Sequence, residues 1–281
     1  MAERGDPSAL RWLIGTELMN ARKRAKVSQK AAGAAAGCSH VTVSQMEAGT
    51  TAQEPARITK MMKRYGCDQA DIDRMARLAG SYADRGAWWA DYADVVPDWL
   101  ATFVGLEGLA SFSFVYEQAV LPGPVQIPEY AEAMLVDHLR VAAADVPQVV
   151  ELRMARQERL SGDDPLEFVT VIEEDTLDRL IGGPAVMRRQ YQRLLELDEL
   201  PNVTLLMMPK ALAVHDGLDG ELMLLSFRDA QSIAYFEFQD GAVYIQDQDR
   251  VKKYDFTRKR MCQRAVPAAQ AIKDRLDRLA V

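Results

Sequence analysis

Apolar and polar positions follow a helical period on both sides of Gly37. Before it, residues 31–36 are all Ala or Gly, which suits a short helix packed closely against a neighbour. After it, Val43 and Met46 have the three-residue spacing of a buried helical stripe. Ser28 and Ser39 precede the two patterns as candidate N-caps, and Gly37 can adopt the left-handed conformation that ends a helix. The pattern predicts two short helices joined by a tight turn, the layout of a helix-turn-helix.

The second helix leaves a polar face for DNA. We expect His40, Val41, Ser44 and Gln45 to lie on or beside that face. A Gln side chain can pair with adenine and a Val can touch a thymine methyl group in the major groove. Ser39 and Thr42 are candidates for phosphate contacts, and so are Gln29 and Lys30 at the start of the first helix. The alternative is an alanine-rich helical hairpin whose polar face is only solvated.

Residues 81–110 form an aromatic and acidic segment that includes Trp88, Trp89 and Tyr92. We expect it to connect two domains, with its aromatic residues packed at helical spacing. Beyond it, patterns of period two and 3.6 alternate. The predicted strands cover residues 112–117, 167–172, 203–208, 221–227, 232–238 and 242–246, and the predicted helices cover 128–141, 147–160, 185–197, 249–265 and 267–279. This succession predicts a mixed α/β domain over residues 111–281, so that the whole chain is an α+β multidomain protein.

Charge is divided between the two parts. Residues 1–80 hold 13 Lys or Arg and 8 Asp or Glu, a net of +5, and the rest of the chain has a net of −12. Because DNA is a polyanion, an acidic protein binds it best when its basic groups are gathered in one part. The basic part here is the part with the helix-turn-helix pattern.

The pattern of Ser28-Gln29, Gly37, and Ser39 through Glu47-Ala48-Gly49 resembles the phage-repressor-like (Xre) class of helix-turn-helix domains. The resemblance implies an all-α five-helix DNA-binding domain over residues 1–80. Its first helix would cover residues 10–26 and its last two residues 55–65 and 68–79. Lys30 and the alanines at 31–36 depart from the Glu and Leu of many relatives, so we expect helix two to be less well anchored. Because one recognition helix reads only a few base pairs, we expect a homodimer on a palindromic operator.

A second set of short motifs lies along the rest of the chain: Tyr116-Glu117, Arg153 with Arg156, Gly182-Gly183, Pro201-Asn202-Val203, and His215 with Gly217. Their order resembles the C-terminal domain of the actinobacterial WhiJ-like, antitoxin-like transcriptional regulators. Residues 118–120 and 123–126 depart from the usual turn of that family. The resemblance implies a transcriptional regulator whose C-terminal domain receives a small-molecule signal or binds a small protein encoded nearby. The alternative it implies is an antitoxin-like protein that neutralises such a partner and regulates its own operon.

Five residues of the second part are candidates for ligand or partner binding: Tyr116, Glu117, Arg153, Arg156 and His215. The two arginines could face one way on a helix and receive a carboxylate or phosphate, but surface pairing with Glu151 or Glu158 is the simpler interpretation. The loop at residues 215–220 could bind a cation or ligand, although Asp and Gly turn chemistry explains it equally.

Other chemistry lacks a signature in the sequence. The three cysteines and three histidines, among them His138, have no metal-ligand spacing, and we expect no metal and no cofactor. Gly182-Gly183-Pro184 lacks the Lys-Ser/Thr of a phosphate-binding loop, and no nucleophile or paired acid indicates an enzyme. We find no signal peptide and no apolar run long enough for a membrane span, so we expect a cytoplasmic protein.

Overall fold

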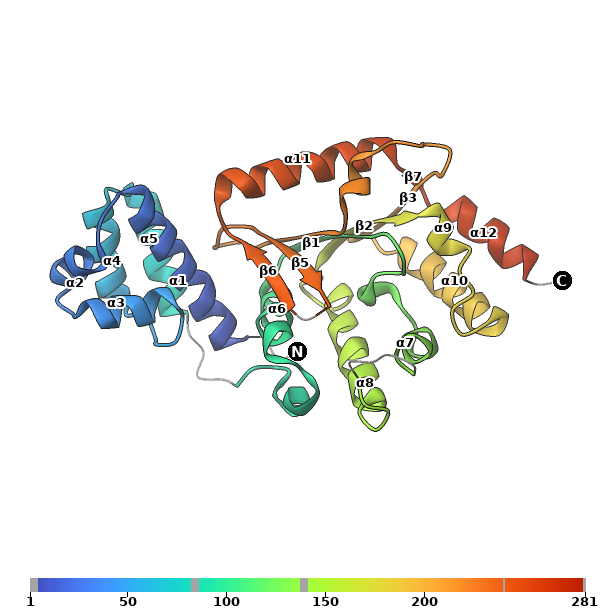
Figure 1. Ribbon diagram of the computed structural model, residues 1–281, viewed down its shortest axis with the longest axis horizontal. Coiled ribbons are helices and arrows are strands. Elements are labelled where there is room, and N and C mark those ends of the chain that lie inside the picture. Colours follow the sequence, from blue (N-terminus) through green and yellow to red (C-terminus); the bar gives the residue numbers. More distant parts are fainter. Residues whose placement is uncertain (1–4, 82–85, 137–140, 240, 280–281) are drawn as a thin grey trace.

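The computed structural model describes residues 5–81, 86–136, 141–239 and 241–279. Its N-terminal part is entirely helical (Figure 1). The helices are α1 (Pro7–Arg24), α2 (Gln29–Ala36), α3 (His40–Glu47), α4 (Pro55–Tyr65) and α5 (Gln69–Gly80). Asp6, Ser28, Ser39 and Asp68 cap four of them through side-chain hydrogen bonds to backbone N–H groups, and Pro55 opens α4 at a position where its missing N–H is harmless. The five-helix prediction is confirmed.

The rest of the chain is built on a seven-stranded mixed sheet in the order β6-β5-β4-β1-β2-β3-β7. The strands are β1 (Phe112–Glu117), β2 (Glu167–Glu173), β3 (Val203–Met208), β4 (Leu222–Ser226), β5 (Ile233–Phe238), β6 (Gly241–Ile245) and β7 (Val266–Pro267). β1, β2 and β3 are parallel, because helical crossovers join them, and the other pairs are antiparallel. The predicted α+β class with a mixed α/β second part is confirmed.

Helices cover both faces of the sheet (Figure 1). The α-helices are α6 (Asp98–Leu109), α7 (Pro128–Leu135), α8 (Val146–Gln157), α9 (Glu174–Leu177), α10 (Pro184–Asp198), α11 (Gln248–Arg264) and α12 (Ala269–Arg278). Short 3₁₀ turns are η1 (Ala90–Val95), η2 (Gly123–Val125), η3 (Glu158–Leu160) and η4 (Asp216–Asp219). Successive residues of β1 bury opposite faces: Val115 packs with α6 and α10, whereas Phe114 and Tyr116 pack on the side of α11.

Several boundaries differ from the sequence prediction. The helix expected over 128–141 ends at Leu135, and residues 137–140, with His138, lie outside the described residues. The last helix begins at Ala269 and not at Pro267, because Val266 and Pro267 pair with β3. Such a short edge strand tolerates a proline, and two residues give no periodic signal. The segment 81–110 contains the whole of α6, and Trp88, Trp89 and Tyr92 pack around Val96, Val104 and Leu152 as the packing interpretation expected.

Helix α1 belongs to two hydrophobic cores. Ala9 and Leu13, on its first turns, are buried in the core of the C-terminal part together with Phe103 and Leu106 of α6. Ile14 and Leu18 are buried in the core of the helical part. The approach to α6 is close, because a Cβ on Gly105 would lie 2.2 Å from Asp6 Oδ2 and 2.8 Å from the Ala9 Cβ. The helix-turn-helix region is therefore attached to the C-terminal domain through a shared helix.

Candidate nucleic-acid interface

The turn between α2 and α3 has the geometry that the sequence predicted. The Ser28 hydroxyl accepts the N–H of Ala31 at 3.2 Å, and Ser39 Oγ accepts that of Thr42 at 3.0 Å. Gly37 ends α2 at φ 72°, in the left-handed region that a residue without a Cβ adopts most easily. A Cβ on Gly33 would lie 2.6 Å from the Cys38 carbonyl oxygen, so the small residues of α2 allow a close approach to the turn. Both caps and the turn are confirmed.

Helix α3 buries one face and exposes the other. Val43 and Met46 are buried in the helical core, whereas His40, Ser44 and Gln45 are exposed and Val41 is 51% exposed. An apolar Val left in solvent beside polar side chains is what a helix that reads base edges presents. Ser39 is the exposed N-cap residue of α3. The hydroxyl of the partly buried Thr42, in the first turn, lies 2.9 Å from the Ser39 hydroxyl.

Gln29, a predicted phosphate contact, has a side-chain partner inside the protein. Its Nε2 donates to Glu47 Oε2 at 2.9 Å. The same carboxylate accepts two hydrogen bonds from Arg22, whose Nε and Nη2 lie 2.5 and 2.9 Å from Oε1 and Oε2. This network joins α1, α2 and α3, and its hydrogen bonds to Glu47 raise the pKa of Arg22. The Gln29 side chain therefore positions the recognition helix, while Lys30 beside it is exposed and free to reach a phosphate.

The loop after α3 is fixed by a buried amide that the sequence analysis did not single out. Gln53 is 1% exposed, and its Nε2 donates to the carbonyl oxygens of Met46 and Arg11 at 2.8 and 2.9 Å. Gly49 turns the chain at φ 71°. A Cβ at this position would lie 2.8 Å from the Cα of Trp12, so the backbone of α1 packs directly against the glycine. Glu47 and Gly49 belonged to the Glu-Ala-Gly ending of the motif, whereas a single Gln outside any pattern gave no signal.

The five candidates for ligand or partner binding separate onto opposite faces of the sheet. On the face toward α11, the Tyr116 hydroxyl donates to Glu173 Oε1 at 2.5 Å, and His215 Nε2 lies 3.5 Å from the same atom. His215 is buried, and its Nδ1 accepts the N–H of Gly217 within the η4 turn. Within the turn itself, the His215 ring and not an Asp side chain accepts the backbone N–H.

Glu117 and the two arginines lie on the other face. Arg156 pairs with Glu107 of α6 through two contacts of 2.6 and 3.0 Å, so the predicted surface pairing with Glu151 or Glu158 is wrong for this residue. The partner lies on a helix distant in sequence, which residue spacing cannot reveal. Arg153 Nη1 donates to Gln126 Oε1 at 2.7 Å. Burial, and after it the neighbouring carboxylate of Glu221, raise the pKa of Glu117 to about 8.

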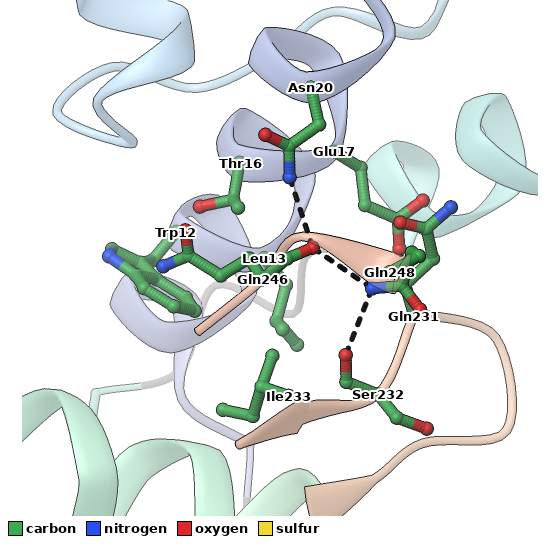
Figure 2. Close-up of a pocket in the computed structure, with 10 residues that line it drawn as sticks. All are labelled: Trp12, Leu13, Thr16, Glu17, Asn20, Gln231, Ser232, Ile233, Gln246 and Gln248. Carbon is green, nitrogen blue, oxygen red and sulfur yellow. Dashed lines mark hydrogen bonds between the residues drawn. The ribbon is translucent and has the colours of Figure 1, made fainter. Parts of the chain in front are cut away.

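The helical part and the C-terminal domain meet at a polar junction. Glu17 and Asn20 of α1 lie there beside Gln231, Gln246 and Gln248 (Figure 2), and Arg74 of α5 pairs with Glu17. Asn20 Nδ2 donates to the Gln246 carbonyl oxygen at 3.2 Å, and Arg74 Nη1 donates to that of Asp229 at 2.7 Å. The recess between these groups holds about 10 Å³, room for roughly one water molecule. The junction is therefore a contact between domains with little free space in this recess.

No group of three or more His, Cys, Asp or Glu side chains among the described residues has the geometry to hold a metal ion. The three cysteines are unpaired thiols. None of the helices in the described ranges combines the length and the apolar character that a membrane crossing requires.

Family comparisons agree with this division of the molecule. A helix-turn-helix domain model matches residues 13–75, which include α2 and α3. A model described as a domain of unknown function (DUF5753) matches residues 100–274, from within α6 to within α12. Neither the curated proteins nor the solved structures gave a match. Since the second model covers more than half of the chain, the protein belongs to the DUF5753 family and carries that domain behind an N-terminal helix-turn-helix domain.

Proposed function

We propose that this protein is a sequence-specific DNA-binding transcriptional regulator. The observation that carries the proposal is the exposed face of α3, where His40, Val41, Ser44 and Gln45 stand clear of the protein while Val43 and Met46 hold the helix in its core. Lys23, Arg24 and Lys26 at the end of α1, with Lys30, are exposed cations near the same motif. Base-edge contacts by α3 supply sequence preference, and the cations supply salt-dependent phosphate contacts.

One recognition helix reads only a few base pairs, so we propose a homodimer on a palindromic operator in the cytoplasm, with half-sites about one helical turn apart, ~34–36 Å. The C-terminal domain then receives the signal, as in the WhiJ-like regulators that the sequence resembles, and the protein performs no catalysis. The junction supports this arrangement, because a change at β5 or β6 bears directly on α1 through Asn20 and Glu17.

The test is selection of bound duplexes from a random-sequence library by the full-length chain. We expect enrichment of one palindromic sequence, and we expect the double variant His40→Ala/Gln45→Ala to lose that enrichment while it still binds DNA at low salt. Enrichment of a single half-site would contradict the dimer, and no enrichment at all would contradict sequence-specific binding.

A second candidate is an antitoxin-like function, in which the C-terminal domain neutralises a small partner protein and α3 regulates the shared operon. This function also requires that α3 bind DNA, and it requires in addition that the surface of the C-terminal domain bind the partner protein. Purification of the native protein from its own cells with whatever binds it, followed by mass spectrometry, separates a partner protein from a small-molecule effector.

A further inference from the structure

Helix α11 is a basic element in an acidic domain. Residues 248–264 hold seven Lys or Arg and two Asp, a net of +5, although residues 81–281 together have a net of −12. The helix lies along the outer side of the sheet (Figure 1). Its apolar residues Val251 and Met261 are buried, and Tyr254 packs against Phe236 of β5 with ring centroids 5.0 Å apart.

The opposite side of this helix is exposed and cationic. We call it the α11 basic face, defined as Lys252, Lys253, Phe256, Lys259, Arg260 and Gln263, which recur at three- and four-residue spacing. Phe256 is 61% exposed at the centre of the face, and the Arg260 guanidinium lies 5.9 Å from its ring centroid. One acid, Asp249, precedes these residues on the same side.

The charges of the face are neutralised only in part from within the protein. Arg260 Nε pairs with Asp216 Oδ2 of the η4 turn at 3.0 Å. Lys252 and Lys259 contact Asp249 and Asp255 within the helix, with both partners of the first pair more than three quarters exposed. Exposed pairs of this kind contribute little. In the described part of the chain, Lys253 has no carboxylate partner at all. The face therefore carries net positive charge around an aromatic side chain that nothing covers.

We propose that the α11 basic face docks an acidic segment of a partner protein, with Phe256 as the apolar anchor. Charge complementarity selects an acidic surface, and aromatic residues are the usual centres of protein interfaces. The proposal deepens the proposed function, on which it rests for the regulatory consequence, by giving the signal-receiving domain a surface and its partner a chemistry.

Two other occupants fit the face less well. α11 lies along the top of the C-terminal part in Figure 1, away from α3 in the helical part, so a DNA contact by α11 would be separate from the one that α3 makes. An exposed Phe also adds nothing to a phosphate contact. A membrane would need the apolar side of the helix, which is buried against the sheet.

The position of α11 gives docking a route to the DNA-binding domain. Gln248, the first residue of α11, donates from Nε2 to the carbonyl oxygens of Gln246 and Ser232 at 3.0 and 3.1 Å. The Gln246 carbonyl also accepts the hydrogen bond from Asn20 of α1 (Figure 2). Two hydrogen bonds that share the Gln246 carbonyl oxygen therefore connect α11 with α1, the helix shared by both cores.

The test begins with a photo-crosslinking amino acid at position 256 of the full-length chain in its own cells, with the same probe at exposed Leu180 as control. We expect a protein crosslinked at 256 and not at 180, and with an acidic segment at the crosslink. The partner, once purified, is titrated against the full-length chain by fluorescence anisotropy. Lys252→Glu/Lys253→Glu/Lys259→Glu should lower its affinity by more than about tenfold and Phe256→Ala by about tenfold.

The matched control is Arg188→Glu/Lys273→Glu/Arg278→Glu, which changes the net charge equally at exposed positions on α10 and α12 and should leave affinity within about twofold. The proposal would be overturned if no protein were crosslinked, or if position 256 crosslinked only to DNA, to lipid or to a second copy of this chain. Equal losses of partner affinity in both triple variants would also overturn it. All variants should bind DNA as the unmodified chain does. If the unmodified chain itself did not bind DNA, that result would instead contradict the proposed function.

Discussion

The backbone N–H of Gln231, in the loop before β5, donates a hydrogen bond of 2.5 Å to Glu17 Oε1 of α1. The same carboxylate pairs with Arg74 of α5 at 2.8 Å, and its side chain is only 6% exposed. One buried acid thus satisfies a donor from each domain. Because removal of either domain would leave polar groups of the other unpaired, the helix-turn-helix and the C-terminal domain are expected to unfold as a coupled unit.

Glu17→Gln should destabilise that unit. The substitution removes the more buried of the two charges that pair with Arg74 and leaves only the half-exposed Asp71, at a cost of about 2 kcal/mol. Urea unfolding followed by tryptophan fluorescence measures the loss. Asp73→Asn on the exposed side of α5 is the control and should leave the midpoint unchanged. An unchanged midpoint for Glu17→Gln as well would mean that the junction contributes nothing to stability.

Gly105→Ala should separate α1 from α6. The added methyl group would meet Asp6 and Ala9 at distances that no Cβ adopts, so the helices must move apart at a cost of about 1–3 kcal/mol. We expect faster hydrogen exchange in the first turns of α1 and a lower melting temperature. Gly86→Ala, where the Cβ meets nothing within 4 Å, is the matched control. Equal exchange in the two variants would contradict the close packing of these helices.

Gln29→Ala should weaken binding to all DNA sequences alike. Its amide holds Glu47, so its loss leaves the recognition helix less firmly placed and costs about 1 kcal/mol of stability. Gel-shift titrations on the selected operator and on unrelated DNA give the comparison, and Lys30→Ala, an exposed neighbour, should weaken binding without lowering stability. A change of sequence preference in Gln29→Ala would mean that this side chain reads bases.

Gln45→Ala and His40→Ala should relax base preference. Each exposed side chain that reads a base edge contributes about 1–3 kcal/mol of discrimination, and its removal affects one position of the site. The measurement is affinity for the operator and for its single-base variants. Lys60→Ala, an exposed cation on α4, is expected to alter salt dependence at most. If Gln45→Ala left both affinity and preference unchanged, α3 would not be the reading helix.

Glu117 should lower the free energy of unfolding as the pH rises from about 4.5 to about 8. Its pKa is raised to about 8 by burial and by Glu221, and to a lesser degree by Glu237, so the folded protein holds a proton that the unfolded chain releases near pH 4.5. Stability is then highest below pH 4.5 as far as this group is concerned, and it declines until pH 8. Glu117→Gln should raise the melting temperature at pH 8.5 and change it little at pH 5. Equal shifts at both pH values would rule out a raised pKa.

The sequence by itself determined the local structure of the DNA-binding motif. Ser28, Gly37 and Ser39 act through contacts within one or two turns of the chain, so their roles as caps and turn follow from residue type and spacing. Periodicity likewise predicted β1 to β6 and most helices, because alternation and the 3.6-residue repeat are local properties. The division of charge at residue 80 was also visible, although the average concealed the basic helix α11.

Only the tertiary structure decided which of these elements meet. The order of strands, the two-residue β7 and the sharing of α1 between two cores depend on contacts between residues tens to hundreds of positions apart. Gln231 bonds to Glu17, 214 residues away in the sequence. Arg156 pairs with Glu107, 49 residues away, whereas spacing along the helix had suggested Glu151 or Glu158. A buried charge is paired by whichever group the fold brings within reach. That choice rests on packing, and no local pattern in the chain contains it.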